Sequence, residues 1–549
     1  MCEVMKNRKS IKKNLSMSKY LLMPAAVILV LGLAGCSVRT AVPETEEKGL
    51  TLTIFDKNAM SDTFDDRVAQ EIMKRTGIKI ELAEPTENPE EKLNLMLAYK
   101  DYPDIMLMNL KGGDIINKYI SSEVFIDLAP YIERYGNHIS SMYAETLPKL
   151  QNQDGKIYYL SNWYGEDPDA VTGFLMRYDI LKELVGEDRA DSSKPYTMDE
   201  FIGLMYAFKE KYPRIDGRET IPMTVNPETD GYIDALFGMF GMKKYYEAKE
   251  GLRYQVYDPH YLDMVLFFNR LYREGYLDKE WFVNKSKRNQ EKLESGLVFS
   301  SLGSYWDVTY VNANLRQKFG KDAAFYCYKV IGNGVQADET TYSGRNSLGW
   351  DAIGITKNCK NVEAAMKLID FLASEEGQYL MLWGVEGQDW DMVEGKHVPR
   401  QEVLDQFQED YNGAMNRTGI RKWTWFIKNG AGVDGTPYDL TTKYLVSDEA
   451  RIANQNIGLS DYWDTAVYDG LEPAVGSAAA LKQQNIQDIY KRTFPRMIYA
   501  STEAEVVSIY EKLIQDMESE GLSEVESVIN QNYRSRMKLW QKQMEWSVE

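Results

Sequence analysis

The sequence predicts an α/β protein of two lobes or more, and two observations carry this prediction. Strand and helix patterns alternate between residues 50 and 108 in the order β-α-β-α-β, which is typical of a largely parallel sheet covered by helices. The chain of 549 residues is also too long for one ordinary domain. We therefore expect an α/β protein with at least two lobes rather than a single compact domain.

The individual elements follow from hydrophobic periodicity and from capping residues. The first part of the chain predicts a strand at 50–55, a helix capped by Ser61 or Asp62 and ended by Gly77, a strand at 78–82, a helix beginning at Asn88, and a strand at 105–108. Later strands are expected at 155–160, 172–177, 297–302 and 349–356. Later helices are expected after a capping box at 197–200, at 262–274, at 362–372 with Gly377 closing it, and through most of 502–546.

The start of the chain predicts export and lipid attachment. Basic residues precede an apolar run at 21–33, which is shorter than the roughly 20 residues needed to span a bilayer. The run ends in two small residues followed by Cys36, whose thiol can be acylated, and this pattern resembles the lipobox of bacterial lipoproteins. We expect residues 1–35 to be a lipoprotein signal peptide and 36–48 a lipidated flexible tether on the extracytoplasmic face of the cell membrane. The alternative is an ordinary signal or anchor.

The composition excludes several classes of partner. A formal net charge of −19 argues against nucleic acid and anionic lipid, because both require basic surfaces. No later segment is long and apolar enough to span a bilayer, so contact with the membrane is expected through the lipid anchor alone. Apolar residues make up 44% of the chain, enough for a substantial core, and aromatic residues reach 12%, more than a core needs.

Motifs for catalysis and for metal binding are weak. The three histidines are far apart, and no HExxH, GxSxG or Walker motif is present. The run 332–337 matches a dinucleotide fingerprint in letters only, because no helix follows it. The acidic run 187–193 lacks the EF-hand ligand pattern, so a solvated loop is preferred over a calcium site. Cys327 and Cys359 are either buried thiols or a disulfide, and we expect no cofactor.

Several short segments resemble one known family in their order and spacing. Together they make the chain similar to the family 1 extracellular solute-binding proteins of ABC importers, in the branch of longer oligosaccharide-binding lipoproteins. The segments that carry this resemblance are 75–78, 102–105, 127–131, 155–160, 176–179, 196–201, 364–372 and 374–377.

The resemblance implies a periplasmic-binding-protein-like fold, with two α/β lobes joined by a multi-strand hinge and a ligand cleft between them. It implies crossings between the lobes near 160–164 and 347–351. It implies no catalysis, and its partners are a carbohydrate ligand and ABC transporter permease subunits, with a monomeric binding protein. The expected division is 49–161 plus 350–395 for the first lobe and 165–347 plus 396–549 for the second.

A sugar presents apolar C–H faces and a rim of hydroxyl groups, so its binding needs aromatic platforms beside planar polar side chains. Such sets occur at predicted strand ends and crossings, where ligands of α/β proteins bind. The candidate ligand-binding residues are Asn58, Asn109, Asn162, Trp163, Tyr164, Tyr305, Trp306, Asp307, Trp350, Asp351, Trp390, Trp423 and Trp425.

Each of these aromatic residues has a second interpretation, as packing of the core or of the surface. Trp306 and Trp350 are favoured as ligand contacts because each adjoins an aspartate at a strand end or crossing. Trp423 and Trp425 face the same side if they lie on a strand, which makes either a stacking wall or ordinary sheet packing. Arg177 is expected to form a structural ion pair with Asp179 or another acid rather than to bind ligand.

An exported carbohydrate-active enzyme, either a glycoside hydrolase or a lyase, is the alternative function. A hydrolase needs two carboxylates flanking the scissile bond, and 83 acidic residues always offer a pair on paper. A repetitive adhesive protein is disfavoured because the chain has no internal repeats. The preferred function is not enzymatic: the protein captures an oligosaccharide by lobe closure and delivers it to a permease.

Overall fold

A computed structural model describes residues 50–59, 63–86, 88–110, 114–152, 154–165, 170–458 and 461–540. The expected signal peptide, Cys36 and the tether lie outside the described residues. The body from residue 50 onward contains two separate hydrophobic cores, each built around its own sheet. We call the part around the sheet that contains the first strand the first lobe, and the other part the second lobe.

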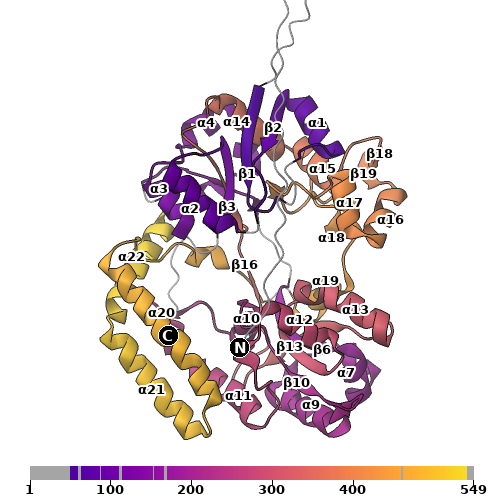
Figure 1. The fold of residues 1–549 in the computed structure, drawn as a ribbon, viewed down its shortest axis with the longest axis vertical. Coiled ribbons are helices and arrows are strands. Elements are labelled where there is room, and N and C mark those ends of the chain that lie inside the picture. The colour runs from indigo at the N-terminus through magenta and orange to yellow at the C-terminus, as the bar shows by residue number, and fades with distance from the viewer. Residues whose placement is uncertain are drawn as a thin grey trace, which may run out of the picture. The chain divides into compact units, whose positions relative to one another are not determined.

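The first-lobe sheet has the strand order β2-β1-β3-β17-β4. β1 (Leu50–Asp56) runs parallel to β2 (Ile78–Leu82) and to β3 (Ile105–Asn109), which confirms the predicted β-α-β-α-β order. β17 (Asp351–Ile355) arrives from much later in the chain and pairs antiparallel with β3. β4 (Leu160–Ser161) completes the sheet and is all that forms of the strand expected at 155–160. Figure 1 shows β1, β2 and β3 in indigo beside α1 and α14.

Helices cover this sheet, and the first begins later than its expected cap. α1 (Arg67–Thr76) is capped by Asp66, whose side chain accepts from a backbone N–H of the first turn. Ser61 and Asp62, the expected caps, lie outside the described residues. Gly77 ends the helix at φ 68°, as predicted. The other first-lobe helices are α2 (Pro89–Tyr99), α3 (Asp114–Ser121), α4 (Ala129–Tyr135), α5 (Asn137–Met142), α6 (Leu147–Leu150), α16 (Gln401–Glu409), α17 (Tyr411–Thr418) and α18 (Thr441–Tyr444).

The helix expected at 362–372 forms, but Gly377 does not close it. α14 (Val362–Ala373) ends at Ser374, and the Ser374 side chain caps a new helix, α15 (Glu375–Trp383). Gly377 lies in the first turn of α15, where a Cβ would come within 2.1 Å of the Phe371 carbonyl oxygen. The glycine is therefore required by the close approach of the two helices rather than by a helix end.

The second-lobe sheet has the strand order β10-β13-β6-β14. β13 (Val298–Ser304) pairs parallel with β10 (Ile221–Met223) and antiparallel with β6 (Thr172–Arg177), which also pairs with β14 (Phe325–Tyr328). Figure 1 labels β6, β10 and β13 with α7 and α9 around them. The helices of this lobe are α7 (Tyr178–Val185), α8 (Glu187–Ala190), α9 (Met198–Lys211), α10 (Gly231–Met239), α11 (Tyr261–Arg273), α12 (Ser286–Glu294), α13 (Thr309–Phe319), α19 (Asp448–Ile457), α20 (Ala478–Tyr499), α21 (Glu503–Ser519) and α22 (Leu522–Leu539).

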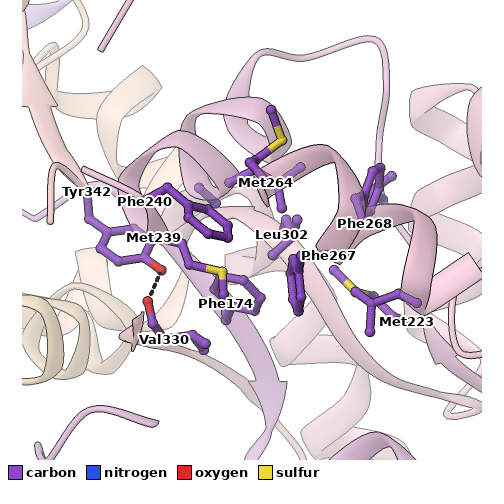
Figure 2. Packing of buried hydrophobic residues seen from close by; sticks show 14 of the residues in the cluster. Phe174, Met223, Met239, Phe240, Met264, Phe267, Phe268, Leu302, Val330 and Tyr342 are labelled. Atoms are coloured by element: carbon purple, nitrogen blue, oxygen red, sulfur yellow. Dashed lines mark hydrogen bonds between the residues drawn. The ribbon is translucent and has the colours of Figure 1, made fainter. Parts of the chain in front are cut away.

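Aromatic and methionine side chains fill the second-lobe core, as Figure 2 shows. Phe174 of β6, Phe267 of α11 and Leu302 of β13 belong to the same buried cluster. The Tyr342 hydroxyl is buried with them and donates to the Val330 carbonyl at 2.6 Å, so the cluster contains a satisfied polar group (Figure 2). Fully burying one such side chain contributes roughly 1.5–3 kcal/mol.

The smaller strands form hairpins and short ribbons. They are β5 (Trp163–Tyr164) with β20 (Ile427–Lys428), β7 (Tyr196–Thr197) with β15 (Val330–Ile331), β8 (Arg214–Ile215) with β9 (Arg218–Glu219), β11 (Tyr245–Ala248) with β12 (Gly251–Tyr254), β16 (Ser343–Arg345) with β21 (Tyr462–Asp464), and β18 (Trp390–Val393) with β19 (Lys396–Pro399).

The lobe assignment expected for 396–549 is wrong for its first part. Val403 and Phe407 of α16 pack into the first-lobe core, and so do buried residues as far as Leu440. The chain returns to the second lobe at α19, where Ala453 is part of the second-lobe core. The physical reason is that α16 and α17 carry an apolar face that the first lobe covers, so the chain crosses a third time between 441 and 453.

The chain changes from one core to the other just after the first expected crossing, 160–164, and just before the second, 347–351. Tyr164 belongs to the first-lobe core and Ala170 to the second, while Tyr342 belongs to the second and Leu348 to the first. The parallel ribbon of β16 and β21 accompanies the second of these crossings. The α/β fold class with two lobes and several connecting segments is confirmed.

Candidate functional site

Polar side chains from three strands meet at one edge of the first-lobe sheet. β1 and β3 are parallel, so their carboxyl ends share an edge, and antiparallel β17 begins there with Asp351 opposite Asn109. The Lys57 ammonium lies 2.8 Å from Asp351 Oδ1 and donates to Asn109 Oδ1 at 2.6 Å. The Asn58 amide donates to Asp351 Oδ2 at 2.6 Å. We call Lys57, Asn58, Asn109 and Asp351 the strand-edge cluster.

The carboxyl groups at this edge of the sheet are buried, whereas two of its amide side chains are exposed. Burial raises the pKa of the Asp351 carboxyl, although the charge and hydrogen bonds of Lys57 and the amide of Asn58 oppose the shift. Burial also raises the pKa of Asp56, the last residue of β1. The carboxyl groups thus bind partners inside the protein, whereas Asn58 and Asn109 are exposed. Exposed amides offer both donors and acceptors, as hydroxyl-rich ligands require.

Trp350 extends the strand-edge cluster with an aromatic surface. It directly precedes Asp351 and is 39% exposed, and its carbonyl accepts from the Leu110 N–H at 2.9 Å. Its ring centroid lies 5.7 Å from that of Trp163, which is buried to 9% exposure. Trp163 therefore supports Trp350 from one side and leaves part of the outer indole open to a ligand.

A second exposed indole lies at the end of a second-lobe strand. β13 runs into a short 3-10 turn, Tyr305–Val308, that carries Trp306 at 45% exposure. Tyr305 packs edge-on against the Trp306 ring with centroids 4.9 Å apart, and the Arg345 guanidinium lies 5.5 Å from the same ring. Asp307 accepts from the Ser304 backbone N–H at 2.9 Å, so its carboxylate caps the turn that holds the indole.

The other candidate tryptophans are buried and bind internal acceptors. The Trp423 indole donates to Asp66 at 2.8 Å and the Trp425 indole donates to Asp56 at 3.0 Å, and each ring is 2% exposed. Trp390 is 7% exposed and donates to a backbone carbonyl. Trp423 and Trp425 therefore pack inside the protein and do not form an open stacking surface. Their indole N–H groups bind Asp66 at the start of α1 and Asp56 at the end of β1, respectively.

Asn162 and Tyr164 are also sealed inside the protein. Both have no exposed surface, and the Tyr164 ring stacks on Tyr143 with centroids 3.7 Å apart. The Asn162 side chain accepts from the backbone N–H groups of Trp350 and Asp351. The structure thus brings Asn58, Asn109, Asn162, Trp163, Trp350 and Asp351 together in the first lobe, and Tyr305, Trp306 and Asp307 in the second.

Sequence reasoning missed two basic residues at these positions. Lys57 directly precedes the candidate Asn58, yet a lone lysine after a strand is usually a solvated side chain. Arg345 lies on β16, where nothing in the local pattern points to the distant Trp306. Arg177, by contrast, pairs with Asp179 at 2.6 Å as expected.

The described part of the chain forms neither a disulfide nor a cluster of metal ligands. Cys327 and Cys359 are free and buried, one in each core, so the disulfide alternative is wrong. No three His, Cys, Asp or Glu side chains among the described residues are grouped to hold a metal ion, and Glu187–Ala190 forms the short helix α8. Within the same residues, none of the helices has the length and apolar character that crossing a bilayer requires.

Two proteins of Bacillus subtilis (strain 168) are similar to this chain in sequence. Lipoprotein LipO is 25% identical over 390 residues, which cover 69% of this chain and 74% of LipO. The polygalacturonan/rhamnogalacturonan-binding protein YtcQ is 25% identical over 419 residues, which cover 72% of this chain and 77% of YtcQ.

A solved structure of the Streptococcus pneumoniae ABC-transporter substrate-binding protein FusA in complex with kestose has a similar fold. The TM-score is 0.59 at 19% sequence identity, and the match covers 89% of this chain and 99% of FusA. The model of the family described as bacterial extracellular solute-binding protein matches residues 67–384, more than half of the chain. This chain therefore belongs to the bacterial extracellular solute-binding proteins.

Proposed function

We propose that this protein captures an oligosaccharide outside the cytoplasm and delivers it to the permease of an ABC importer. Two relatives support the ligand class: YtcQ is named as a polygalacturonan-binding protein, and FusA was solved with the trisaccharide kestose. The family itself consists of binding proteins. In this proposal the chain has no catalytic residues, and it acts by binding and release.

The observation that carries the proposal is the pair of exposed indoles beside polar side chains. Trp306 and Trp350 are 45% and 39% exposed, so part of each indole is open to a ligand. Each adjoins a fixed polar set, the strand-edge cluster for Trp350 and Arg345 for Trp306. Stacking on a sugar ring and hydrogen bonding to its hydroxyl groups are the interactions that such pairs offer.

Lobe closure is the proposed means of capture. Trp350 belongs to the first-lobe side of a crossing and Trp306 to the second lobe, so a sugar bound by both would favour the closed arrangement. A ligand shifts the equilibrium between open and closed forms only by its difference in affinity for the two. The Lys149 ammonium, which binds Asp464 and Ser347 beside the crossing, is one contact that closure would have to preserve or replace.

Lipid attachment at Cys36 completes the proposal. Cleavage before Cys36 and acylation of its thiol would hold the protein at the outer face of the cell membrane, and residues 36–48 would act as the tether. One of the relatives is named a lipoprotein. Permease subunits are the proposed partners, and the binding protein acts as a monomer.

The test is a calorimetric titration of the purified protein with kestose, trigalacturonate and longer members of both series. Saturable binding of either series, with the sugar recovered intact by mass spectrometry, is the expected result. Cleaved sugar would move the protein to the hydrolase or lyase alternative. Absence of binding across both series would overturn the proposed ligand class.

A further inference from the structure

Asn162 uses every one of its hydrogen-bonding groups inside the protein. Its backbone N–H donates to the Asp351 carbonyl at 3.0 Å, and its own carbonyl accepts from the Ile427 N–H at 2.5 Å. Its side-chain oxygen accepts from the N–H groups of Trp350, at 3.3 Å, and Asp351, at 3.0 Å. The side-chain amide donates to the Thr424 carbonyl at 3.5 Å. Because Asn162 has no exposed surface and each of its polar groups makes a bond inside the protein, its side chain is not open to a ligand.

These bonds join three segments that are far apart in the sequence. They link the first crossing, where Asn162 lies, to the start of β17 and to the segment 424–427 that leads into β20. Gly349 shows how closely the segments approach, because a Cβ there would lie 2.4 Å from the Trp163 Cβ and 2.8 Å from the Asn162 side-chain oxygen. Its φ of 71° is also in the region that favours glycine.

We infer that Asn162 is a positioning residue for the ligand site, and that it acts through the backbone of Trp350 and Asp351 without touching ligand. This inference rests on the proposed function, because Trp350 and the strand-edge cluster are the proposed sugar contacts. The Asn162 side-chain oxygen holds the backbone N–H groups of Trp350 and Asp351 in place. It thereby sets the direction in which the Trp350 indole and the Asp351 carboxyl extend from the main chain.

The side chain at this position must accept twice and donate once in one plane, and asparagine does so without charge. Alanine would remove the side-chain partner of the Trp350 and Asp351 N–H groups and of the Thr424 carbonyl, and the Asp351 N–H lies in a fully buried place. A protonated aspartate could still accept from both N–H groups and donate to Thr424. Burial would keep it protonated at acid pH, and ionisation at higher pH would remove the donor.

Asn269 provides a matched control in the second lobe. It too is buried with no exposed surface, and its amide donates to three backbone carbonyls, those of Met497, Ile498 and Ala500. Asn269→Ala therefore removes a comparable network, at a place that shares none of the bonds of Asn162. A loss of stability alone should look alike in Asn162→Ala and Asn269→Ala.

The experiment compares Asn162→Ala, Asn162→Asp and Asn269→Ala in the full chain, at a temperature at which each is folded. Hydrogen exchange reports the Trp350 and Asp351 amides directly, and titration with kestose and trigalacturonate reports binding. Asn162→Ala should accelerate exchange at those two amides and weaken binding by about tenfold or more, the effect of one unsatisfied buried group. Asn269→Ala should change neither quantity.

Asn162→Asp supplies the pH readout and a second variant if Asn162→Ala does not fold. It should keep the two amides protected and bind within about threefold of wild type at pH 5, and lose affinity toward pH 8 as the carboxyl ionises. Unaltered exchange at Trp350 and Asp351 in Asn162→Ala, or equal loss of binding in Asn269→Ala, would overturn the inference. If wild type binds neither sugar, the proposed function fails, and the exchange data still decide whether Asn162 positions these residues.

Discussion

Among single residues, Trp306 and Trp350 differ from the other candidate tryptophans in their exposure to solvent. We expect Trp306→Ala and Trp350→Ala each to weaken sugar binding by about tenfold, since loss of one aromatic stacking contact costs roughly 0.5–1.5 kcal/mol or more. The free energy of unfolding should change little, because 45% and 39% of these side chains are exposed. Calorimetric titration and urea denaturation measure the two quantities.

Tyr206→Ala is the matched control for both substitutions. Tyr206 is also an exposed aromatic residue, at 58%, but it lies on α9 away from any candidate site residue. Its removal should leave affinity unchanged. Equal affinities for wild type, Trp306→Ala and Trp350→Ala would contradict the site assignment.

Among the elements, α1 depends on one acid that serves three partners. Asp66 caps the helix, accepts the Trp423 indole N–H at 2.8 Å and pairs with the Lys422 ammonium at 3.2 Å. Asp66→Ala should lower the free energy of unfolding by about 2–4 kcal/mol, because it removes a cap and leaves a buried donor and a nearly buried charge unpaired. Urea denaturation measures the change. The exposed neighbour gives the control, Asp65→Ala, and an equal loss in both variants would refute the role of Asp66.

A buried ion pair ties α12 to the segment that follows α11, beside the end of β10, and gives the second lobe a defined pH dependence. Lys292 lies 2.6 Å from Asp278, and their side chains are 7% and 8% exposed. Burial alone would raise the pKa of Asp278, but Lys292 and hydrogen bonds, including those from Asn284 and Thr224, hold it below its ordinary value. Its stabilisation is complete above the unfolded-state pKa of about 4 and is lost as pH falls through the lower pKa of the folded state.

Asp278→Asn tests this sign. At pH 7 the variant should lose about 3–5 kcal/mol of unfolding free energy, since a buried lysine is left without its closest carboxylate. Its stability should also fall less steeply than that of wild type between about pH 5 and pH 2. Glu280→Gln is the control, because Glu280 also approaches Lys292, at 3.3 Å, but is 64% exposed. Parallel pH profiles for wild type and Asp278→Asn would contradict the assignment.

Across the whole molecule, the end of α22 reaches the core of the other lobe. Met537 belongs to the second-lobe core, whereas Trp540 packs into the first, with the Lys149 ammonium 5.3 Å from its ring. Lys149 also binds Asp464 at 2.9 Å beside the β16–β21 ribbon. The carboxyl-terminal helix is thus a further link between the two cores, in addition to the crossings of the chain described above.

Trp540→Ala should release this link. We expect a loss of about 3–5 kcal/mol in unfolding free energy, the usual effect of truncating a buried tryptophan, and faster hydrogen exchange confined to α6 and the last turn of α22. Leu481→Ala on α20, at a side chain that is 66% exposed, is the control and should change neither quantity. Uniformly faster exchange throughout the second lobe would instead mean that Trp540 only adds global stability.

Local patterns in the sequence were sufficient where the cause of structure is local. Asn88 begins its helix and Gly77 ends its helix, as predicted, and the capping box at Thr197 forms. The first three strands lie within two residues of their expected limits. Periodicity and caps act over one or two turns, so they are visible in a short window of sequence. Trp306 and Trp350 were favoured as ligand contacts from an equally local sign, an adjoining aspartate, and that assignment stays a prediction.

The tertiary structure alone decided which candidate ligand-binding residues face solvent. It also decided that residues 396–440 pack against the first lobe. Trp423 and Trp425 are buried because Asp66 and Asp56, more than 350 residues earlier, accept their indole N–H groups. No local pattern encodes such a pairing, since its free energy depends on contacts that exist only after the chain has folded. The sequence by itself determined the fold class and the elements that have local signals, such as the first three strands. Long-range packing and burial decided how the side chain of Asn162 came to bind the backbone of Trp350 and Asp351.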